Sequence, residues 1–179
     1  MLAKSSGDEI DRTLGFLPTN EFITTIENYE KGIGTMASML AEEDSKKDDP
    51  QFLLDLGDKL YAHCRFEDAD ARYAGVVKLD STNAAGLADD AQLDRARASA
   101  KLNEYPLAVA FCEALVKRWP KSDLLPDATI YAAYYSDQAG QKEKAVKIYK
   151  EYLQKWPKGE DAEWATGQIK KLTSPPSEE

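Results

Sequence analysis

The residues that could do chemistry in this sequence are its one histidine, His63, and the cysteine beside it, Cys64. A nucleophilic thiol needs a base aimed at its sulfur, but neighbouring side chains on a helix point about 100 degrees apart. We therefore interpret His63 as a histidine at an interhelical turn and Cys64 as a small packed thiol. The second cysteine, Cys112, lies in an apolar helical stripe and is expected in the core.

The other polar clusters lack the spacing of a catalytic or metal site. The two cysteines are too few for a disulfide framework and lack the C-x-x-C spacing of a metal or redox site. Neighbouring carboxylates fall in expected caps or linkers without the opposed geometry of a catalytic dyad: Glu42 with Glu43, Asp48 with Asp49, and Asp89 with Asp90. No phosphate loop or nucleophile elbow is present. We expect no enzymatic activity, no cofactor and no metal site.

The composition is that of a folded, acidic chain. Its 179 residues are 42% hydrophobic and 31% charged, and 32 acidic side chains against 23 basic ones give a net charge of -9. Residues 1–100 carry this whole excess. The negative charge argues against nucleic-acid or anionic-membrane partners, and no apolar run approaches the roughly 20 residues of a spanning helix. Residues 1–7 do not resemble a signal peptide, so we expect a cytoplasmic chain, or a periplasmic one if it is a fragment of an exported parent.

The elements that position these residues are repeated helices. Residues 108–121 (AVAFCEALVKRWPK) echo residues 145–158 (AVKIYKEYLQKWPK), and both the first alanines and the prolines are 37 residues apart. A weaker copy begins at Ala69, which lies 39 residues before Ala108. Each copy follows a hinge and an earlier helical stretch, over residues 50–64, 88–102 and 126–139. We therefore expect three helix-turn-helix repeats, at about 50–83, 88–121 and 126–158.

The third repeat shows how its boundaries arise from local chemistry. Pro126 suits a first helical turn because its missing N–H would be unpaired there. Gly140 ends the first helix, since glycine tolerates the left-handed conformation that commonly closes a helix. Trp156 and Pro157 end the second helix, because proline cannot continue it.

The pattern resembles the tetratricopeptide repeat family over roughly residues 50–172. That family has small residues where the two helices of a repeat cross, which three pairs reproduce: Gly57 with Ala69, Ala96 with Ala108, and Ala133 with Ala145. The second repeat departs furthest, with Gln92, Arg95 and Ser99 where bulkier apolar residues are usual. The lengthened repeats and Trp-Pro-Lys endings look more like the bacterial envelope branch of the family. The resemblance implies an all-α fold, a right-handed α-solenoid of helix-turn-helix repeats.

The two ends of the chain differ from the repeats. Residues 160–172 predict an amphipathic capping helix that covers the last apolar surface, and residues 173–179 a disordered tail. Residues 7–31, with a short strand holding Ile10 and Leu14 and then a helix, look like the closing strand and helix of a thioredoxin-fold domain. A lone strand and helix cannot make that fold, so this segment should dock on the first repeat or move freely.

Between these parts we expect a short helix over residues 35–43 and a charged linker over residues 44–49. The predicted division is therefore an N-terminal segment at 1–47 and a repeat domain at 48–172.

A stacked repeat array offers a concave groove lined by the first helix of each repeat. From the helical phase and the family's usual groove positions, we expect these residues to face it: Leu54, Asp58, Tyr61, Leu93, Arg97, Lys101, Ile130, Tyr134 and Asp137, with Gln138 beside them. The three aliphatic members fit packing against the next helix equally well. Tyrosine and arginine are enriched among residues that dominate binding energy, whereas Asp58 and Asp137 would repel a carboxylate ligand.

Three functional hypotheses follow from these residues. The first is a non-catalytic protein–protein interaction scaffold that binds a peptide or a partner helix in the groove. The alternative is the client-binding C-terminal part of a thioredoxin-like oxidoreductase or redox-linked chaperone. The third is a homo-oligomer formed through the amphipathic helix at residues 20–31, whose apolar residues need a partner: Phe22, Ile23, Ile26 and Tyr29.

Overall fold

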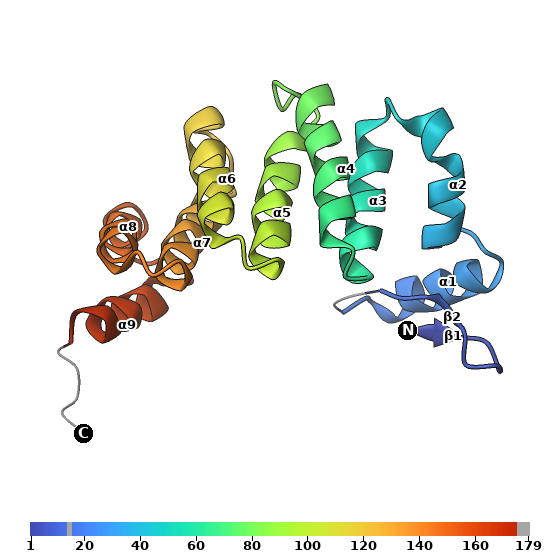
Figure 1. Ribbon diagram of the computed structural model, residues 1–179, viewed down its shortest axis with the longest axis horizontal. Helices are drawn as coiled ribbons and strands as arrows, with labels where there is room; N and C mark the ends of the chain where they lie inside the picture. The colour runs from blue at the N-terminus through green and yellow to red at the C-terminus, as the bar shows by residue number, and fades with distance from the viewer. Residues whose placement is uncertain (14–15, 175–179) are drawn as a thin grey trace. The chain divides into compact units, whose positions relative to one another are not determined.

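The chain folds almost entirely into helices. The computed structural model describes residues 1–13 and 16–174, and a two-stranded sheet at the start is the only sheet within them (Figure 1). The expected all-α helical-repeat fold is confirmed, because consecutive helices pack against each other. Contacts divide the chain into two compact units, Met1–Ala88 (unit 1) and Asp89–Glu179 (unit 2). The division after residue 47 stays a prediction.

Unit 1 begins with an antiparallel pair of strands and continues with helices. The elements are β1 (Leu2–Ala3), β2 (Glu9–Asp11), α1 (Thr19–Glu30), α2 (Met36–Lys46), α3 (Pro50–Ala62) and α4 (Phe66–Leu79). In Figure 1, α1 lies across the direction of α2 and α3. The predicted strand contains Ile10, while Leu14 lies outside the described residues.

Side-chain caps fix where α2 and α3 begin. The Thr35 hydroxyl accepts a hydrogen bond from the N–H of Ser38 at 3.2 Å, and the Asp49 carboxylate accepts one from the N–H of Phe52 at 3.1 Å. Helix α2 continues to Lys46, so the expected charged linker at 44–49 was wrong for its first half. Charged residues do not stop a helix, and this segment contains no Gly or Pro before Pro50.

The core of unit 1 lies between α3 and α4. Leu56, Leu60 and Ala69 are fully buried, and Tyr73 is almost so. Gly57 lets the ring of Tyr73 approach closely, because a Cβ at this position would lie 2.5 Å from its Cε1 atom. The crossing of the two helices therefore depends on the missing side chain.

Unit 2 is a stack of helices: α5 (Ala88–Lys101, whose first residue closes unit 1), α6 (Tyr105–Arg118), α7 (Leu125–Gln138), α8 (Lys142–Lys155) and α9 (Ala162–Thr173). Helices α6 to α9 pack pairwise in chain order. Ala133, Ala145 and Tyr149 are fully buried between them.

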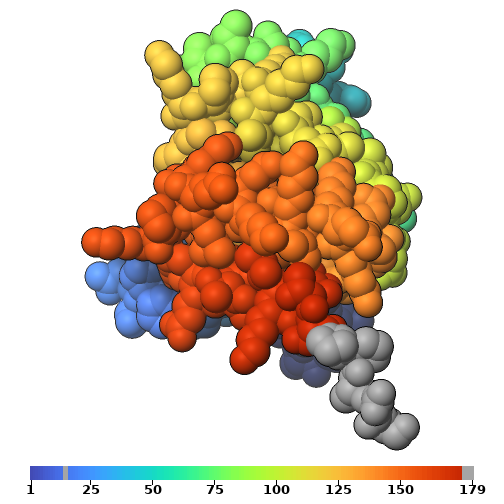
Figure 2. All heavy atoms as spheres, turned by 90° about the vertical axis from the view of Figure 1, so that its left-hand side faces the viewer, coloured from blue at the N-terminus to red at the C-terminus, as the bar shows by residue number. Residues whose placement is uncertain are grey.

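Helix α9 is the predicted cap. It lies beside α8 on the surface that Figure 2 shows in orange and red. Ala165 is fully buried, while Lys170 and Lys171 are exposed on the outer face. Of the predicted disordered tail, residues 175–179 lie outside the described residues.

The turns between paired helices share one backbone feature. Cys64, Asn103 and Gly140 have φ values of 59°, 61° and 75°, and each lies at the same place in its turn. This left-handed conformation is favourable for glycine, tolerated by asparagine and costly for other residues. The turn after α3 is therefore strained at Cys64.

We expect Cys64→Gly to raise the free energy of unfolding of unit 1 by about 0.5–1 kcal/mol. Relief of the left-handed strain, about 1–2 kcal/mol, exceeds the extra entropy that glycine gives the unfolded chain. Urea unfolding followed by far-UV circular dichroism measures the change. Cys64→Ser, which keeps the strain, should leave stability unchanged; equal effects of both substitutions would contradict this account.

Candidate functional site

The His63 and Cys64 pair does not form a nucleophilic site. His63 closes α3, and Cys64 lies beyond the helix with its side chain exposed. The expectation of a packed Cys64 thiol was wrong because the left-handed turn directs it outward. Cys112 is fully buried as expected, and burial raises the pKa of its thiol to about 12, which leaves it protonated and inert.

His63 instead takes part in a buried polar cluster around Asp11. The Asp11 carboxylate is fully buried and accepts hydrogen bonds from Nε2 of His63 at 2.9 Å and from the N–H of Met36 at 2.7 Å. The Lys59 ammonium lies 3.3 Å from the same carboxylate and 3.9 Å from the ring centroid of Tyr29 on α1. The N-terminal segment therefore docks on α3, the first of the two expected alternatives.

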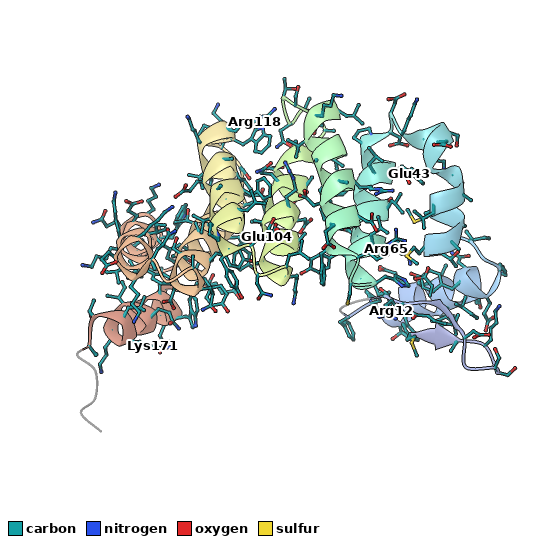
Figure 3. All side chains as sticks on the ribbon, in the orientation of Figure 1. Arg12, Glu43, Arg65, Glu104, Arg118 and Lys171 are labelled. Atoms are coloured by element: carbon teal, nitrogen blue, oxygen red, sulfur yellow. The ribbon has the colours of Figure 1, made fainter. Side chains whose placement is uncertain are left out.

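The charge state of this cluster follows from its contacts. Burial opposes ionisation of Asp11, but hydrogen bonds from His63 and two backbone N–H groups, together with the charge of Lys59, outweigh it. They hold the pKa of Asp11 below its usual value. Arg12, labelled in Figure 3, pairs with Glu9 at the rim of the cluster. This arrangement is an anchor in which both carboxylate oxygens of Asp11 accept hydrogen bonds.

A second ion pair fixes α2. Arg72 of α4 donates two hydrogen bonds, both at 2.9 Å, to the carboxylate of Glu43, which is labelled in Figure 3. On α1, Tyr29 is buried, whereas Phe22 and Ile23 are half exposed. The apolar face proposed for self-association is thus partly used within unit 1.

The predicted groove residues of unit 1 lie on α3 in three environments. Leu54 is buried. Asp58 is exposed and accepts a hydrogen bond from the hydroxyl of Tyr73 at 2.8 Å. Tyr61 is half buried, with its ring 5.1 Å from that of Phe66 in an edge arrangement.

In unit 2 the predicted residues lie on α5 and α7. Leu93 and Ile130 are buried, Asp137 is half buried, and Lys101 and Tyr134 are exposed. The sixth, Arg97, binds Asp94 at 2.8 Å and lies 5.4 Å from the ring centroid of Tyr131.

One hollow of unit 2 lies between α7 and α9. It has a volume of about 290 Å³ and is lined by Ile130, Tyr131, Tyr134, Asp161 and Trp164. We call it the aromatic pocket. It brings together two predicted residues, Ile130 and Tyr134, with three that the sequence reasoning missed. The rings of Tyr134 and Trp164 are 39% and 41% exposed, and their centroids are 6.1 Å apart.

A buried tyrosine supports the wall of this pocket. The ring of Tyr149 meets Trp164 edge-on at 5.6 Å, and its buried hydroxyl has no hydrogen-bond partner among the described residues. Burial raises the pKa of Tyr149, and the nearby Asp137 carboxylate adds to the shift. The hydroxyl therefore stays neutral behind an exposed aromatic pair.

Within the part of the chain that the structure describes, no cluster of histidine, cysteine and carboxylate side chains could hold a metal ion. None of the described helices is long and apolar enough to cross a membrane.

The two helical hairpins of unit 2 repeat one geometry. Each crosses at buried alanines, Ala96 with Ala108 and Ala133 with Ala145, and each turns through a residue of positive φ. Residues 90–122 and 128–159 match the tetratricopeptide repeat family. The match leaves out the α3–α4 pair. No curated protein matches the chain.

In the first matched segment, two of the unusual polar residues contact the second helix. The side-chain amide of buried Gln92 donates to the backbone oxygen of Phe111 at 3.1 Å. The Arg95 guanidinium lies 4.1 Å from the Phe111 ring centroid. Buried Ser99 adds little volume, so the two helices pack closely without large apolar residues.

The aromatic pocket lies between the first helix of the second matched segment and the capping helix. The 37-residue spacing was a signal that could have found Trp164: Ala91, Ala128 and Ala165 are successive buried alanines at this spacing. Helix α9 therefore takes the position that the first helix of a further repeat would have. Its Trp164 then lies beside the expected groove face.

Proposed function

We propose that the chain is a non-catalytic protein-interaction module that binds a peptide or a partner helix on the first helices of its repeats. Tetratricopeptide repeats generally mediate protein–protein interactions. The observation that carries the proposal is the aromatic pocket with its exposed pair, Tyr134 and Trp164. Exposed aromatic side chains beside a hollow are the residues that bind partner side chains most strongly.

The remaining predicted groove residues stay in this proposal as two separate sets, one on each unit. Arg97, Lys101 and Asp137 lie on α5 and α7 of unit 2, and Asp58 and Tyr61 lie on α3 of unit 1. Their types favour extended peptides with apolar and basic side chains, since Asp58 and Asp137 repel carboxylates. Leu54 and Leu93, being buried, serve packing in this proposal.

Crosslinking and capture from the native host tests the function. We expect Tyr134→Ala to lower partner capture by about tenfold, because truncating a central aromatic contact typically removes more than 1 kcal/mol of binding energy. Leu107→Ala is the matched control, since Leu107 on α6 is 41% exposed and lies outside the pocket. Equal capture by wild type and Tyr134→Ala would reject this surface as the binding site.

Three further hypotheses stay proposals. The pair of strands before α1 is the observation that supports a thioredoxin-like parent, and a C-x-x-C motif in the coding region upstream of residue 1 would test it. The bacterial envelope branch rests on the lengthened repeats and the Trp-Pro-Lys endings. Self-association through Phe22 and Ile23, half exposed on α1, is tested by light scattering of a Phe22→Ser, Ile23→Ser variant.

A further inference from the structure

The aromatic pocket has the wall composition that attracts organic cations. Tyr131 and Tyr134 are three residues apart on α7 and lie on one helix face, and Trp164 closes the hollow from α9. A cation within about 6 Å of an aromatic centroid is attracted to the negative face of the ring, and sets of such rings form cages for cations. Three rings around one hollow therefore indicate more than apolar packing.

The charge at the pocket is negative. Asp161 is the one charged residue that lines it, and the carboxylate forms no ion pair with any described residue. The first turn of α9 also carries Glu163. The helix N-terminus contributes only about half a positive charge, which the full charge of the Asp161 carboxylate exceeds. The nearby guanidinium of Arg97 is paired with Asp94 at 2.8 Å. A cationic ligand is attracted here and a carboxylate ligand is repelled.

The volume limits the ligand to one side chain. A cavity of about 150 Å³ holds a benzene ring, whereas drug-sized ligands occupy roughly 300–1,000 Å³. The 290 Å³ of this pocket therefore suits one large side chain. Arginine fits better than lysine, because its planar guanidinium is weakly hydrated, stacks on aromatic rings and donates a fork of hydrogen bonds to a carboxylate.

A tyrosine ring and an aspartate already bind one of the chain's own arginines, Arg97, beside the pocket. Arg97 lies over the Tyr131 ring at 5.4 Å and donates to the Asp94 carboxylate at 2.8 Å. A tyrosine face with an aspartate thus binds a guanidinium in this unit. The contact with Arg97 also fixes the ring of Tyr131 before any ligand arrives, which lowers the entropic cost of binding.

We propose that the aromatic pocket binds an arginine side chain of the partner peptide, with the guanidinium stacked on Tyr134 and Trp164 and hydrogen-bonded to Asp161. This inference rests on the proposed function and specifies the chemistry of its ligand. A partner lacking arginine at this position loses both the stacking and the ion pair.

Fluorine NMR of the full chain labelled with 5-fluorotryptophan provides the test. The three tryptophans, at positions 119, 156 and 164, give separate reporters within unit 2. We expect N-acetyl-arginine amide to shift the Trp164 signal saturably and to leave that of Trp119 in place. N-acetyl-citrulline amide, an uncharged analogue of similar shape, should bind roughly tenfold more weakly.

Substitutions separate the two contacts. Asp161→Asn should weaken arginine binding roughly fivefold, and it should leave α9 folded because the Asp161 side chain makes no capping hydrogen bond. Asp123→Asn, an exposed carboxylate before α7, is the matched control and should have no effect. Tyr134→Ala should weaken arginine binding by a similar factor, and the fluorine signal of Trp164 still measures that binding.

The outcomes distinguish this inference from the proposed function. Equal binding of the arginine and citrulline probes, or no effect of Asp161→Asn, would overturn the arginine site. If partner capture still depended on Tyr134 in that case, the interaction module would stand with a different ligand. Arginine binding without Tyr134-dependent capture would instead reject the proposed function and retain the pocket's chemistry.

Discussion

Asp11→Asn is expected to lower the free energy of unfolding of unit 1 by about 3 kcal/mol. Removing one partner of a buried ion pair leaves the other charge without compensation, which typically costs about 3–5 kcal/mol. Here the uncompensated group is Lys59, 13% exposed and in contact with Tyr29. The remaining contact with Tyr29 places the expected loss at the lower end. The N-terminal strands and α1 should then detach from α3.

Hydrogen exchange of α3 peptides, measured by mass spectrometry, reports this loss locally. All three tryptophans lie in unit 2, so their fluorescence shows in the same samples whether unit 2 stays folded. Asp55→Asn is the control on the same helix, because Asp55 is exposed and bonds only its neighbour Gln51. Protection of α3 equal in both variants would contradict the anchor.

The stability of unit 1 should also depend on pH through Asp11. Its pKa in the folded chain lies below the unfolded value, so its contribution is fully present above about pH 4. The contribution falls as the pH drops through the lower folded pKa. Wild-type unit 1 should therefore lose protection steadily in acid, and Asp11→Asn should show a flatter profile. Parallel profiles would show that other carboxylates dominate acid unfolding.

Gly57→Ala is expected to destabilise unit 1 by about 2–3 kcal/mol. The new Cβ would lie 2.5 Å from the ring of Tyr73, a distance that no relaxed structure contains. The ring cannot move aside cheaply, because Tyr73 is 1% exposed and its hydroxyl is held by Asp58. Overpacking a core in this way typically costs about 1–3 kcal/mol, and here it exceeds the helix propensity that alanine adds.

A glycine-to-alanine substitution where no atom blocks the new Cβ should raise the free energy of unfolding instead of lowering it. Gly167 lies in α9 with no atom within 4 Å of an added Cβ, so Gly167→Ala should stabilise unit 2 by about 0.5–1 kcal/mol. Urea unfolding followed by circular dichroism and tryptophan fluorescence separates the two units. A neutral Gly57→Ala would show that the crossing of α3 and α4 is looser than the contacts indicate.

The helices and their turns were predictable because their signals are local. Pro126 and Gly140 set the bounds of α7 through the chemistry of single residues, and both bounds agree with the structure within one residue. The 37-residue spacing likewise places buried alanines at each crossing of unit 2. The helix ends depend on neighbours within one turn and the repeats on a fixed spacing, and the sequence displays both directly.

The site was less predictable because its contacts are long-range. Asp11 and His63 are 52 residues apart, and no spacing rule connects a strand to the end of a distant helix. Trp164 lines the pocket from the capping helix, for which the sequence pattern predicts only a buried face and a charged face. Helical phase alone does not decide whether Ile130 faces a groove or the core. The structure shows that Ile130 is buried and lines the pocket.

The anchor at Asp11 also sets an order of assembly. Closing a loop of 52 residues costs about 3.5 kcal/mol of chain entropy, which only the completed contacts can offset. During synthesis, the strands and α1 emerge before Lys59 and His63 exist, so the Asp11 carboxylate remains hydrated until α3 has formed. The residues of unit 1 that are made earliest are therefore secured only after α3 has been made.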